Sequence, residues 1–387
     1  MRLDCIDLPK RNALVESWYQ REKKCHSVAY LLTAQATQSA LDSEVQEVLI
    51  RSRAPLRLGL AGGGSDVSPF SETYGGYVLN ATISLYARVS IQTSEKNIAS
   101  FRSIDQGEFS QCDLSAAELH DGEVNLARGV FRRFIDQYGP APCGFDLTTC
   151  VDAPAGSGLG TSSTLVVALV AAFADLFGVG MGEYDIAQLA FDIERRDLKM
   201  AGGKQDQYAA AFGGFNFMEF GPGDHVIVNP LRLRKELISE LESNLVLFYT
   251  GRSRVSAKII EVQSRNVGGD RPQSLAAMMQ LKDQATKMKA AILKGNLAEV
   301  GELLDYGWKL KKSTADEVSN STIDKMYQAA CEAGSLGGKI SGAGGGGFMM
   351  FYCPATTRYK VIEALENFGG EFRNFQFSRE GVTTWRA

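Results

Sequence analysis

Apolar residues recur along this chain with two periods, one typical of strands and one typical of helices. Leu56, Leu58 and Leu60 alternate with Arg57 and Gly59, which predicts a half-buried strand. Similar apolar segments predict strands at residues 77–91, 145–151, 215–220, 226–228, 245–249 and 348–352. Apolar residues at helical spacing predict helices at residues 14–32, 124–138, 184–199, 275–294, 297–311 and 322–332. An uninterrupted apolar run at residues 165–173 predicts a buried helix.

Three glycine-rich segments interrupt this pattern, and each lies beside a predicted strand or helix. The first glycine segment (residues 62–64) ends a strand and comes just before Asp66. The middle glycine segment (residues 156–160) leads into the predicted buried helix, and the last glycine segment (residues 342–347) precedes a strand. Glycine lets a backbone turn sharply and approach a ligand closely. Each segment is therefore a candidate ligand loop.

The middle glycine segment has the features of a phosphate loop. A Ser/Thr cluster at residues 161–164 follows it, and such a cluster typically begins a helix. The unpaired N–H groups and the positive end of the helix dipole suit phosphate oxygens, and the hydroxyl groups could reach a Mg²⁺ ion. An ordinary helix cap after a glycine-rich turn is the alternative. A Walker loop is excluded because no lysine follows Gly160, and the glycine spacing does not match a dinucleotide loop.

Composition and charge narrow the class of protein. A chain of 387 residues with 44% hydrophobic and 22% charged residues is long enough for two domains with substantial cores. The formal net charge of -4 provides no general attraction to nucleic acid or to anionic membranes. Seven scattered cysteines without a CxxC pair indicate a reducing cytoplasm, with neither a disulfide framework nor a zinc site. The first residues lack the apolar core of a signal peptide, and the apolar run is too short to span a bilayer.

The chain divides into three parts by its changes in character. Residues 1–49 contain no glycine and predict a largely helical appendage. The pattern of strands and glycine segments begins at Ile50, and Gly221-Pro222-Gly223 is the best candidate for a linker. We therefore expect an N-terminal domain at residues 50–221 and a C-terminal domain at residues 222–387.

Two aspartates stand beside glycine turns and are candidates for chemistry. Asp66 follows the first glycine segment, where it could meet a polyhydroxylated ligand; an Asx turn in a hairpin is the alternative. Asp206 follows Gly202 and Gly203, where it could act as a catalytic base; a helix cap is the alternative. Taken alone, neither residue decides between its two interpretations.

Taken together, the three glycine segments resemble the motifs of the GHMP kinases, the family named for galactokinase, homoserine kinase, mevalonate kinase and phosphomevalonate kinase. The first motif matches residues 55–66, the second matches residues 154–164 (PAGSGLGTSST) and the third matches residues 339–347. The resemblance covers about residues 50–387. It implies an α+β fold of two domains with the active site in the cleft between them, and an ATP-dependent phosphotransferase that uses Mg²⁺.

The resemblance also implies roles for individual residues. Asp206 is expected to be the catalytic base and Arg57 its cationic neighbour. Ser162 and Glu194 are expected to bind Mg²⁺. The residues expected to hold the ATP phosphates are Pro154, Gly156, Ser157, Gly158, Leu159, Gly160, Thr161, Ser162 and Ser163. Those expected to border the acceptor are Gly63, Gly64, Ser65, Asp66, Gly342, Gly344 and Gly345.

Within the family, the segments RAPLRLGLAGGGSD, YGGYVLNATISLY and GGKQDQYAAAFGGFNF resemble the bacterial D-glycero-D-manno-heptose 7-phosphate kinases. This resemblance implies phosphorylation of the anomeric 1-hydroxyl, on the way to nucleotide-activated heptose for surface polysaccharide. Candidate cations for the 7-phosphate are Lys199, Lys204, Arg132 and Arg133. The two arginines also fit the solvated face of an amphipathic helix. Another sugar acceptor such as fucose or galactose, or a non-catalytic sugar or nucleotide sensor, stays open, as does a homodimer.

Overall fold

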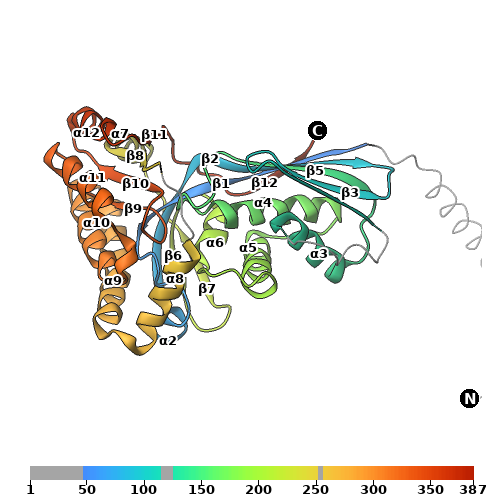
Figure 1. Cartoon of the computed structure of the whole chain (residues 1–387), viewed down its shortest axis with the longest axis horizontal. Coiled ribbons are helices and arrows are strands. Elements are labelled where there is room, and N and C mark those ends of the chain that lie inside the picture. Colours follow the sequence, from blue (N-terminus) through green and yellow to red (C-terminus); the bar gives the residue numbers. More distant parts are fainter. Residues whose placement is uncertain (1–46, 115–124, 252–255) are drawn as a thin grey trace, which may run out of the picture. The chain divides into compact units, whose positions relative to one another are not determined.

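Two long antiparallel strands form the centre of the fold (Figure 1). β1 (Leu49–Ala61) pairs with β2 (Gly76–Ser94) along most of its length. The predicted alternation is confirmed, because Leu56, Leu58 and Leu60 are buried in one core cluster. Successive side chains of a strand point to opposite faces. Arg57 therefore lies on the other face of β1, where the candidate site is.

The computed structural model describes residues 47–114, 125–251 and 256–387. The helix expected at residues 14–32 lies outside these residues, as does nearly all of the expected appendage. Residues 48–387 form one compact unit. In the part of the chain that is described, no helix is both long and apolar enough to cross a membrane.

The larger sheet has the strand order β12-β1-β2-β5-β3-β4, with β6 beside β2 and β7 beside β6. Its pairs are antiparallel except for β3 and β5. The further strands are β3 (Ile98–Ser103), β4 (Glu108–Asp113), β5 (Gly144–Val151), β6 (Phe215–Phe220), β7 (Val226–Pro230) and β12 (Thr383–Arg386).

The expected linker is instead the tight turn of the β6–β7 hairpin. Gly221 donates its N–H to the carbonyl of His225 at 3.0 Å. Gly and Pro suit such a turn as well as they suit a linker. The predicted boundary at residue 221 thus falls inside one sheet, which β12 also joins from the end of the chain. The position of the domain boundary stays a prediction.

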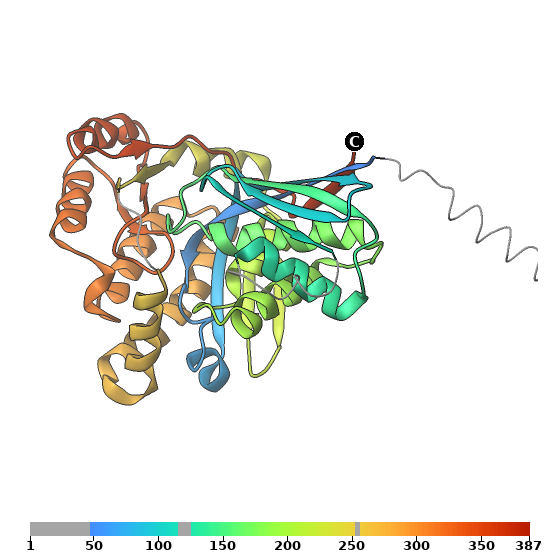
Figure 2. The same ribbon diagram turned by 45° about the vertical axis from the view of Figure 1, so that its right-hand side comes forward.

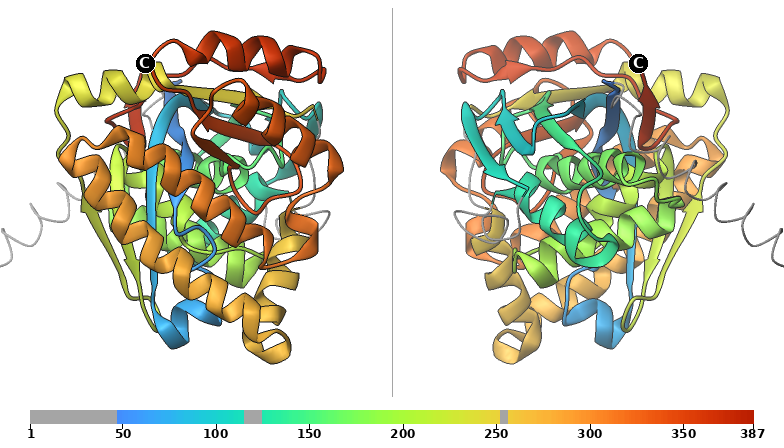
Figure 3. Two further views of the ribbon diagram at one scale, coloured as in Figure 1. Left: turned by 90° about the vertical axis from the view of Figure 1, so that its left-hand side faces the viewer. Right: turned by 90° about the vertical axis from the view of Figure 1, so that its right-hand side faces the viewer.

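Helices cover one face of the larger sheet, as Figure 2 and the right-hand view of Figure 3 show. α4 (Thr161–Leu176) is the predicted buried helix, and every residue from Ser163 to Ala174 is buried in it. The sequence is apolar on all sides because the helix has neighbours on all sides. The other elements on this face are α3 (Leu126–Tyr138), α5 (Glu183–Asp192), the π-helical turn η1 (Ile193–Asp197) and α6 (Gln205–Phe212).

The opposite side carries the predicted pair of antiparallel helices, α9 (Pro272–Lys294) and α10 (Leu297–Lys312), which are joined through Gly295. The left-hand view of Figure 3 shows both helices in front of the long strands. Met288 and Ile292 of α9 and Leu304 of α10 share a core cluster with Leu58 of β1. These contacts fix the C-terminal end of α10 beside the first glycine segment.

A smaller antiparallel sheet has the order β11-β8-β10-β9 and carries the last glycine segment between β9 and β10. Its strands are β8 (Leu245–Tyr249), β9 (Gly337–Ile340), β10 (Phe348–Tyr352) and β11 (Glu371–Phe372). The remaining elements are α2 (Phe70–Tyr74), α7 (Lys235–Asn244), α8 (Ser256–Arg265), η2 (Asn266–Asp270), η3 (Asp316–Val318), α11 (Ser321–Glu332) and α12 (Thr357–Glu366).

Candidate active site

A cavity of about 430 Å³ lies where the three glycine segments meet. Gly64, Gly158 and Gly342 each contribute to its lining. The middle and last glycine segments touch through their backbones, because a Cβ built on Gly158 would lie 2.2 Å from the carbonyl oxygen of Ser341. Only residues without a side chain allow this approach. The glycines therefore bring β1, α4 and β10 together around one space.

The middle glycine segment has the backbone of an anion-binding loop. Gly156, Gly158 and Gly160 have φ angles of 71°, 85° and 78°, which other residues rarely adopt. Gly160 precedes the first turn of α4, in which there is no acidic residue. The turn's N–H groups and the helix dipole therefore present positive potential, and Ser162 lines the cavity there. The segment can hold phosphate oxygens.

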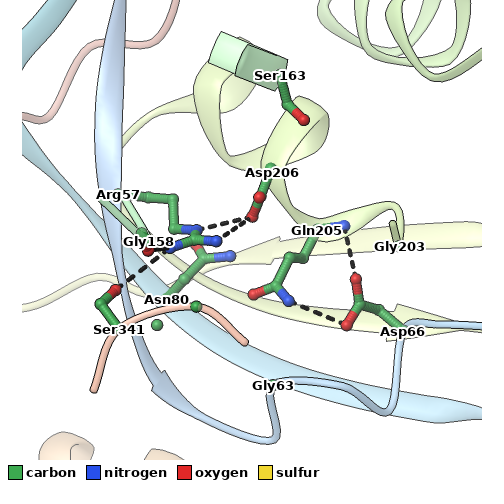
Figure 4. A network of polar contacts seen from close by, with 12 residues as sticks. Arg57, Gly63, Asp66, Asn80, Gly158, Ser163, Gly203, Gln205, Asp206 and Ser341 are labelled. Carbon is green, nitrogen blue, oxygen red and sulfur yellow. Dashed lines mark hydrogen bonds and ion pairs between the residues drawn. The ribbon is translucent and has the colours of Figure 1, made fainter. Parts of the chain in front are cut away.

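Arg57 and Asp206 both line the cavity and form an ion pair, which Figure 4 shows. The Arg57 Nε and Nη2 atoms both lie 2.7 Å from Asp206 Oδ1. Arg57 Nη1 donates to the carbonyl of Gly158 and to Ser341 Oγ. The arginine side chain is 4% exposed and the aspartate side chain 21% exposed. The contact expected between the two residues is present, and Arg57 also links Gly158 of the middle glycine segment to Ser341, which directly precedes the last one.

Asp66 lies on the other side of the cavity and is held by Gln205 (Figure 4). The backbone N–H of Gln205 donates to Asp66 Oδ2 at 3.1 Å, and its side-chain Nε2 donates to Oδ1 at 3.0 Å. Asp66 is buried, and burial together with the nearby charge of Asp206 raises its pKa. A Cβ on Gly203 would lie 1.9 Å from Asp66 Oδ2, so this glycine is required for the arrangement. Asp66 Oδ1 also accepts from the N–H of Gly64 at 3.2 Å; this donor precedes Asp66, whereas an Asx turn uses the N–H two residues after the aspartate.

Glu194 reaches the cavity from η1. The predicted helix at residues 184–199 changes to π-helical form at Ile193, and π-helical turns are frequent at functional sites. Glu194 accepts a hydrogen bond from Gln207 Nε2 at 2.5 Å, and its Oε1 atom is buried without a hydrogen bond among the described residues. The Arg195 Nη1 atom lies 3.7 Å from this Oε1 atom. Burial raises the pKa of this carboxyl group.

Comparison with known proteins bears on the same residues. Residues 125–214 match the N-terminal domain of GHMP kinases, and residues 288–371 match their C-terminal domain. A D-glycero-alpha-D-manno-heptose 7-phosphate kinase of Campylobacter jejuni is 44% identical over 339 residues, which are 87% of this chain and 99% of that protein. This chain belongs to the GHMP kinase family. The predicted α+β fold with the two GHMP kinase domains is confirmed.

Two further relatives of this GHMP kinase help to place it. A crystal structure of a D-glycero-D-manno-heptose 1-phosphate kinase from Bacteroides thetaiotaomicron superposes with a TM-score of 0.74 at 41% identity, covering 87% of this chain and 99% of that one. A bifunctional fucokinase/GDP-fucose pyrophosphorylase of Arabidopsis thaliana is 30% identical over 331 residues, which are 80% of this chain and 30% of that protein.

Most of the expected site residues of this GHMP kinase line the cavity. They are Arg57, Gly64, Asp66, Gly156, Gly158, Gly160, Thr161, Ser162, Ser163, Glu194, Asp206 and Gly342. Seven others are not among its lining residues, and their expected roles stay predictions. They are Gly63, Ser65, Pro154, Ser157, Leu159, Gly344 and Gly345.

The residues outside the lining have structural contacts that explain their positions. Leu159 is fully buried in a core cluster. Ser65 Oγ donates to the carbonyls of Gly62 and Tyr77 and so closes the first glycine turn. The carbonyl of Ser157 accepts from the N–H of Phe348 at 2.8 Å. These residues shape the loops from behind.

Pro154, Gly344 and Gly345 are held by contacts of their backbones. Pro154 is exposed, and its carbonyl accepts from the N–H of Ser157 at 3.1 Å. The N–H of Gly345 donates to the carbonyl of Val318 at 2.5 Å, and a Cβ on Gly344 would lie 2.7 Å from the same residue. The last glycine segment thus reaches the cavity through Gly342, while its middle packs on η3.

Of the four cations expected to hold an acceptor phosphate, only Lys199 lines this cavity within the described part of the chain. It has a φ of 54°, an uncommon conformation for a lysine. Lys204 is buried and donates to the carbonyl of Gly223. Arg132 and Arg133 line a different, more open cavity beside α3, where Arg133 pairs with Asp197 at 2.9 Å.

Sequence reasoning missed two polar residues that line the cavity. Gln205 positions Asp66, and Lys311 of α10 lines the cavity. Gln205 could have been found, because it adjoins Asp206 in the sequence. Lys311 could not, because no periodicity distinguishes a lysine that faces a cavity from one that faces water. Lys339, the first residue of the third motif, is buried beside the site and donates to the carbonyl of Gly59 at 2.7 Å.

Proposed function

We propose that this protein is an ATP-dependent kinase that transfers the γ-phosphoryl group of ATP to the anomeric 1-hydroxyl of D-glycero-D-manno-heptose 7-phosphate. The observation that carries the proposal is the 44% identity to a kinase named for that sugar phosphate, over nearly the whole of that protein. The intact pair of Arg57 and Asp206 favours an enzyme over a non-catalytic sensor. The identity of the acceptor sugar and the choice of its 1-hydroxyl as the site of transfer are the most specific parts of the proposal.

The middle glycine segment and the first turn of α4 bind the donor's phosphates in this proposal. Phosphoryl transfer depends mainly on positioning and on positive potential around the transferred group. Backbone N–H groups held in place by Gly158 and Gly160 supply both, and they need no rearrangement when the charge shifts. Ser162 and Ser163 add hydroxyl groups at the same helix end.

Asp206 accepts the proton of the attacking hydroxyl in this proposal. Its Oδ1 atom is held by Arg57 Nε and Nη2, which fix the orientation of the carboxylate group. A carboxylate within hydrogen-bond reach of the hydroxyl is the geometry that general base catalysis requires. Asp66, positioned by Gln205, accepts hydrogen bonds from the sugar hydroxyls on the opposite wall of the cavity.

The residues present fit a Mg²⁺ ion bound together with the nucleotide. No three His, Cys, Asp or Glu side chains among the described residues converge to hold a metal ion by themselves. Mg²⁺ commonly takes one or two protein oxygens plus phosphate oxygens and water. The buried Oε1 of Glu194 and the hydroxyl of Ser162 can provide those protein oxygens. When bound, the ion neutralises charge on the phosphates of ATP.

The test is an acceptor screen with the purified full-length protein. ADP release is measured with ATP and Mg²⁺ against D-glycero-D-manno-heptose 7-phosphate, the same heptose without phosphate, fucose, galactose and mevalonate. We expect the highest kcat/KM with heptose 7-phosphate, and ³¹P NMR of the product should show a new anomeric phosphate. Asp206→Asn serves as the inactive control. Turnover of fucose or galactose without turnover of heptose 7-phosphate would overturn the proposal.

Fucose is the second candidate acceptor, because a bifunctional fucokinase is 30% identical over 80% of this chain. The same screen decides between the two sugars. If heptose 7-phosphate is the acceptor, we further propose a role in supplying nucleotide-activated heptose for surface polysaccharide, with the reaction in the cytoplasm. A homodimer remains a prediction that size-exclusion chromatography with light scattering can test.

A further inference from the structure

Lys311 is buried at a place where its neighbours in the sequence are exposed. It is 4% exposed, whereas the side chain of Lys309 on the same helix is 69% exposed and that of Lys312 is 37% exposed. Lysine is rarely buried, because its ammonium group loses hydration. Lys311 is nevertheless buried near the C-terminal end of α10, and it lines the cavity.

The ammonium group of Lys311 lies between two of the glycine segments. Its Nζ atom is 2.7 Å from the carbonyl oxygen of Gly342 and 3.5 Å from that of Gly63. Gly342 is in backbone contact with Gly158 of the middle glycine segment. The ammonium group therefore lies between the last glycine segment, which adjoins the phosphate loop, and the turn that precedes Asp66.

The surroundings of Lys311 are rich in positive charge. Lys339 and Arg57 both lie close enough to Lys311 for their charges to interact. The pKa of Lys339 is well below its usual range, mainly because the side chain is buried and also because Lys311 and Arg57 are nearby. Arg57 is engaged by Asp206, Gly158 and Ser341. Lys311 is a cation of this group that lines the cavity from the C-terminal half of the chain.

We propose that Lys311 is a phosphoryl-binding residue, whose ammonium group contacts oxygens of a phosphoryl group in this cavity. The inference rests on the proposed phosphotransferase function. The phosphoryl group has two possible sources: the γ-phosphoryl group in transfer and the phosphate of a phosphorylated acceptor. Both offer the same anionic oxygens, and a charge-assisted hydrogen bond from a buried ammonium group is among the stronger contacts available to them.

Kinetics of Lys311→Met and Lys311→Gln test the proposal. The methionine keeps the length of the side chain without charge, and the glutamine keeps an N–H donor for the carbonyls of Gly63 and Gly342. Lys309→Met, on the exposed side of the same helix, is the matched control. For each variant, kcat and KM are measured with ATP, heptose 7-phosphate and the unphosphorylated heptose, and the affinities for ADP and for ADP with aluminium fluoride are measured by calorimetry.

The two sources give different results. If Lys311 binds the acceptor's phosphate, KM for heptose 7-phosphate rises by about ten- to a hundredfold, as expected for the loss of a hydrogen bond to a charged group, while KM for the unphosphorylated heptose is unchanged. If it binds the transferred group, kcat falls with both acceptors, and affinity for ADP with aluminium fluoride falls by a similar factor while affinity for ADP does not.

Two outcomes would overturn the proposal. One is that both Lys311 variants behave like Lys309→Met in all of these measurements. The other is that affinities for ADP, for ADP with aluminium fluoride and for both acceptors fall together with the melting temperature, which indicates a clamp between loops instead of a ligand contact. If wild-type protein does not use heptose 7-phosphate, the proposed acceptor fails, and the calorimetry with aluminium fluoride still tests Lys311 because it needs no acceptor.

Discussion

Two nitrogens of Arg57, Nε and Nη2, lie 2.7 Å from the same carboxylate oxygen of Asp206, Oδ1. The other carboxylate oxygen, Oδ2, lies 3.3 Å from the position that a Cβ on Gly160 would take. Gly160 lines the cavity and precedes the first turn of α4. The arginine therefore holds the carboxylate from one side and turns its second oxygen toward the end of the phosphate loop.

Asp206→Asn is expected to lower kcat by about 10²- to 10⁴-fold, the range for loss of a general base. ATP binding should persist, because the middle glycine segment contacts the phosphates through backbone groups. Steady-state kinetics and calorimetry with ATP measure the two effects, and thermal unfolding checks the fold. Asp224→Asn, at an exposed ion pair with Arg196, is the control. Near-normal turnover of the Asp206 variant would refute the base assignment.

Arg57→Met is expected to destabilise the protein by about 3 kcal/mol, the lower end for breaking a buried ion pair, because Asp206 keeps some contact with water. The carbonyl of Gly158 and Ser341 Oγ also lose their donor. Arg53→Met is the control on the same strand, where the exposed pair with Glu380 contributes about 0–1 kcal/mol. Urea unfolding measures both. Equal decreases in the free energy of unfolding in the two variants would show that the buried ion pair contributes no more than the exposed one.

Gly158→Ala is expected to abolish ATP binding and to lower stability more than Gly178→Ala. Both glycines have positive φ angles, 85° and 67°, so each alanine carries a similar backbone cost of about 1–2 kcal/mol. The two positions differ in the room for a side chain. A Cβ on Gly158 would lie 2.2 Å from the carbonyl oxygen of Ser341, whereas a Cβ on Gly178 would have nothing within 4 Å. Melting temperatures and ATP calorimetry of the two variants isolate the contact. Identical behaviour would argue against the close approach of the loops.

The pH dependence of stability is expected to reflect Asp66. Its pKa is raised in the folded protein, by burial and then by the charge of Asp206, from about 3.8 in the unfolded chain. The folded state therefore binds the proton more tightly, and this contribution to stability is full below pH 3.8 and is lost as the pH rises through the folded pKa. Asp66→Asn lacks it.

The unfolding free energy of wild type minus that of Asp66→Asn should consequently decrease from acid to neutral pH. Denaturant unfolding of both proteins across that range measures the difference, in which any constant cost of the asparagine cancels. A difference that increases with pH would mean that hydrogen bonds from Gln205 and Gly64 outweigh burial at this carboxyl group.

Glu194→Gln is expected to raise the Mg²⁺ concentration needed for half-maximal activity by about tenfold or more, a loss typical of altered metal sites. The buried Oε1 atom is the oxygen that the substitution weakens as a ligand. Asp192→Asn, two residues earlier in α5 and paired with Arg196, is the control. Mg²⁺ titrations at saturating ATP measure the effect. An unchanged titration curve in the Glu194 variant would remove this residue from the metal site.

Local patterns predicted the two long strands, the buried helix and the antiparallel helix pair, whereas β3, β4 and β12 of the larger sheet were not predicted. The strands at 215–220 and 348–352 have the predicted bounds, and the buried helix was recognisable from its apolar run. The helix expected to continue to Lys199 instead becomes π-helical at Ile193. Apolar spacing cannot reveal that change, because one additional residue in a turn leaves the surrounding period intact. The change matters, since Glu194 belongs to this π-helical turn and lines the cavity.

By itself, the sequence determined the three glycine segments, the strands and helices that flank them, and the pairing of Arg57 with Asp206, the last through resemblance to a family. Such features depend on neighbours in the chain or on patterns shared with relatives. Tertiary packing alone decided that Ser65 and Leu159 support their loops from behind, that Arg132 and Arg133 line another cavity, and that Lys311 is the buried lysine of α10. The physical reason is that burial of a side chain depends on which distant segments pack against its helix or loop.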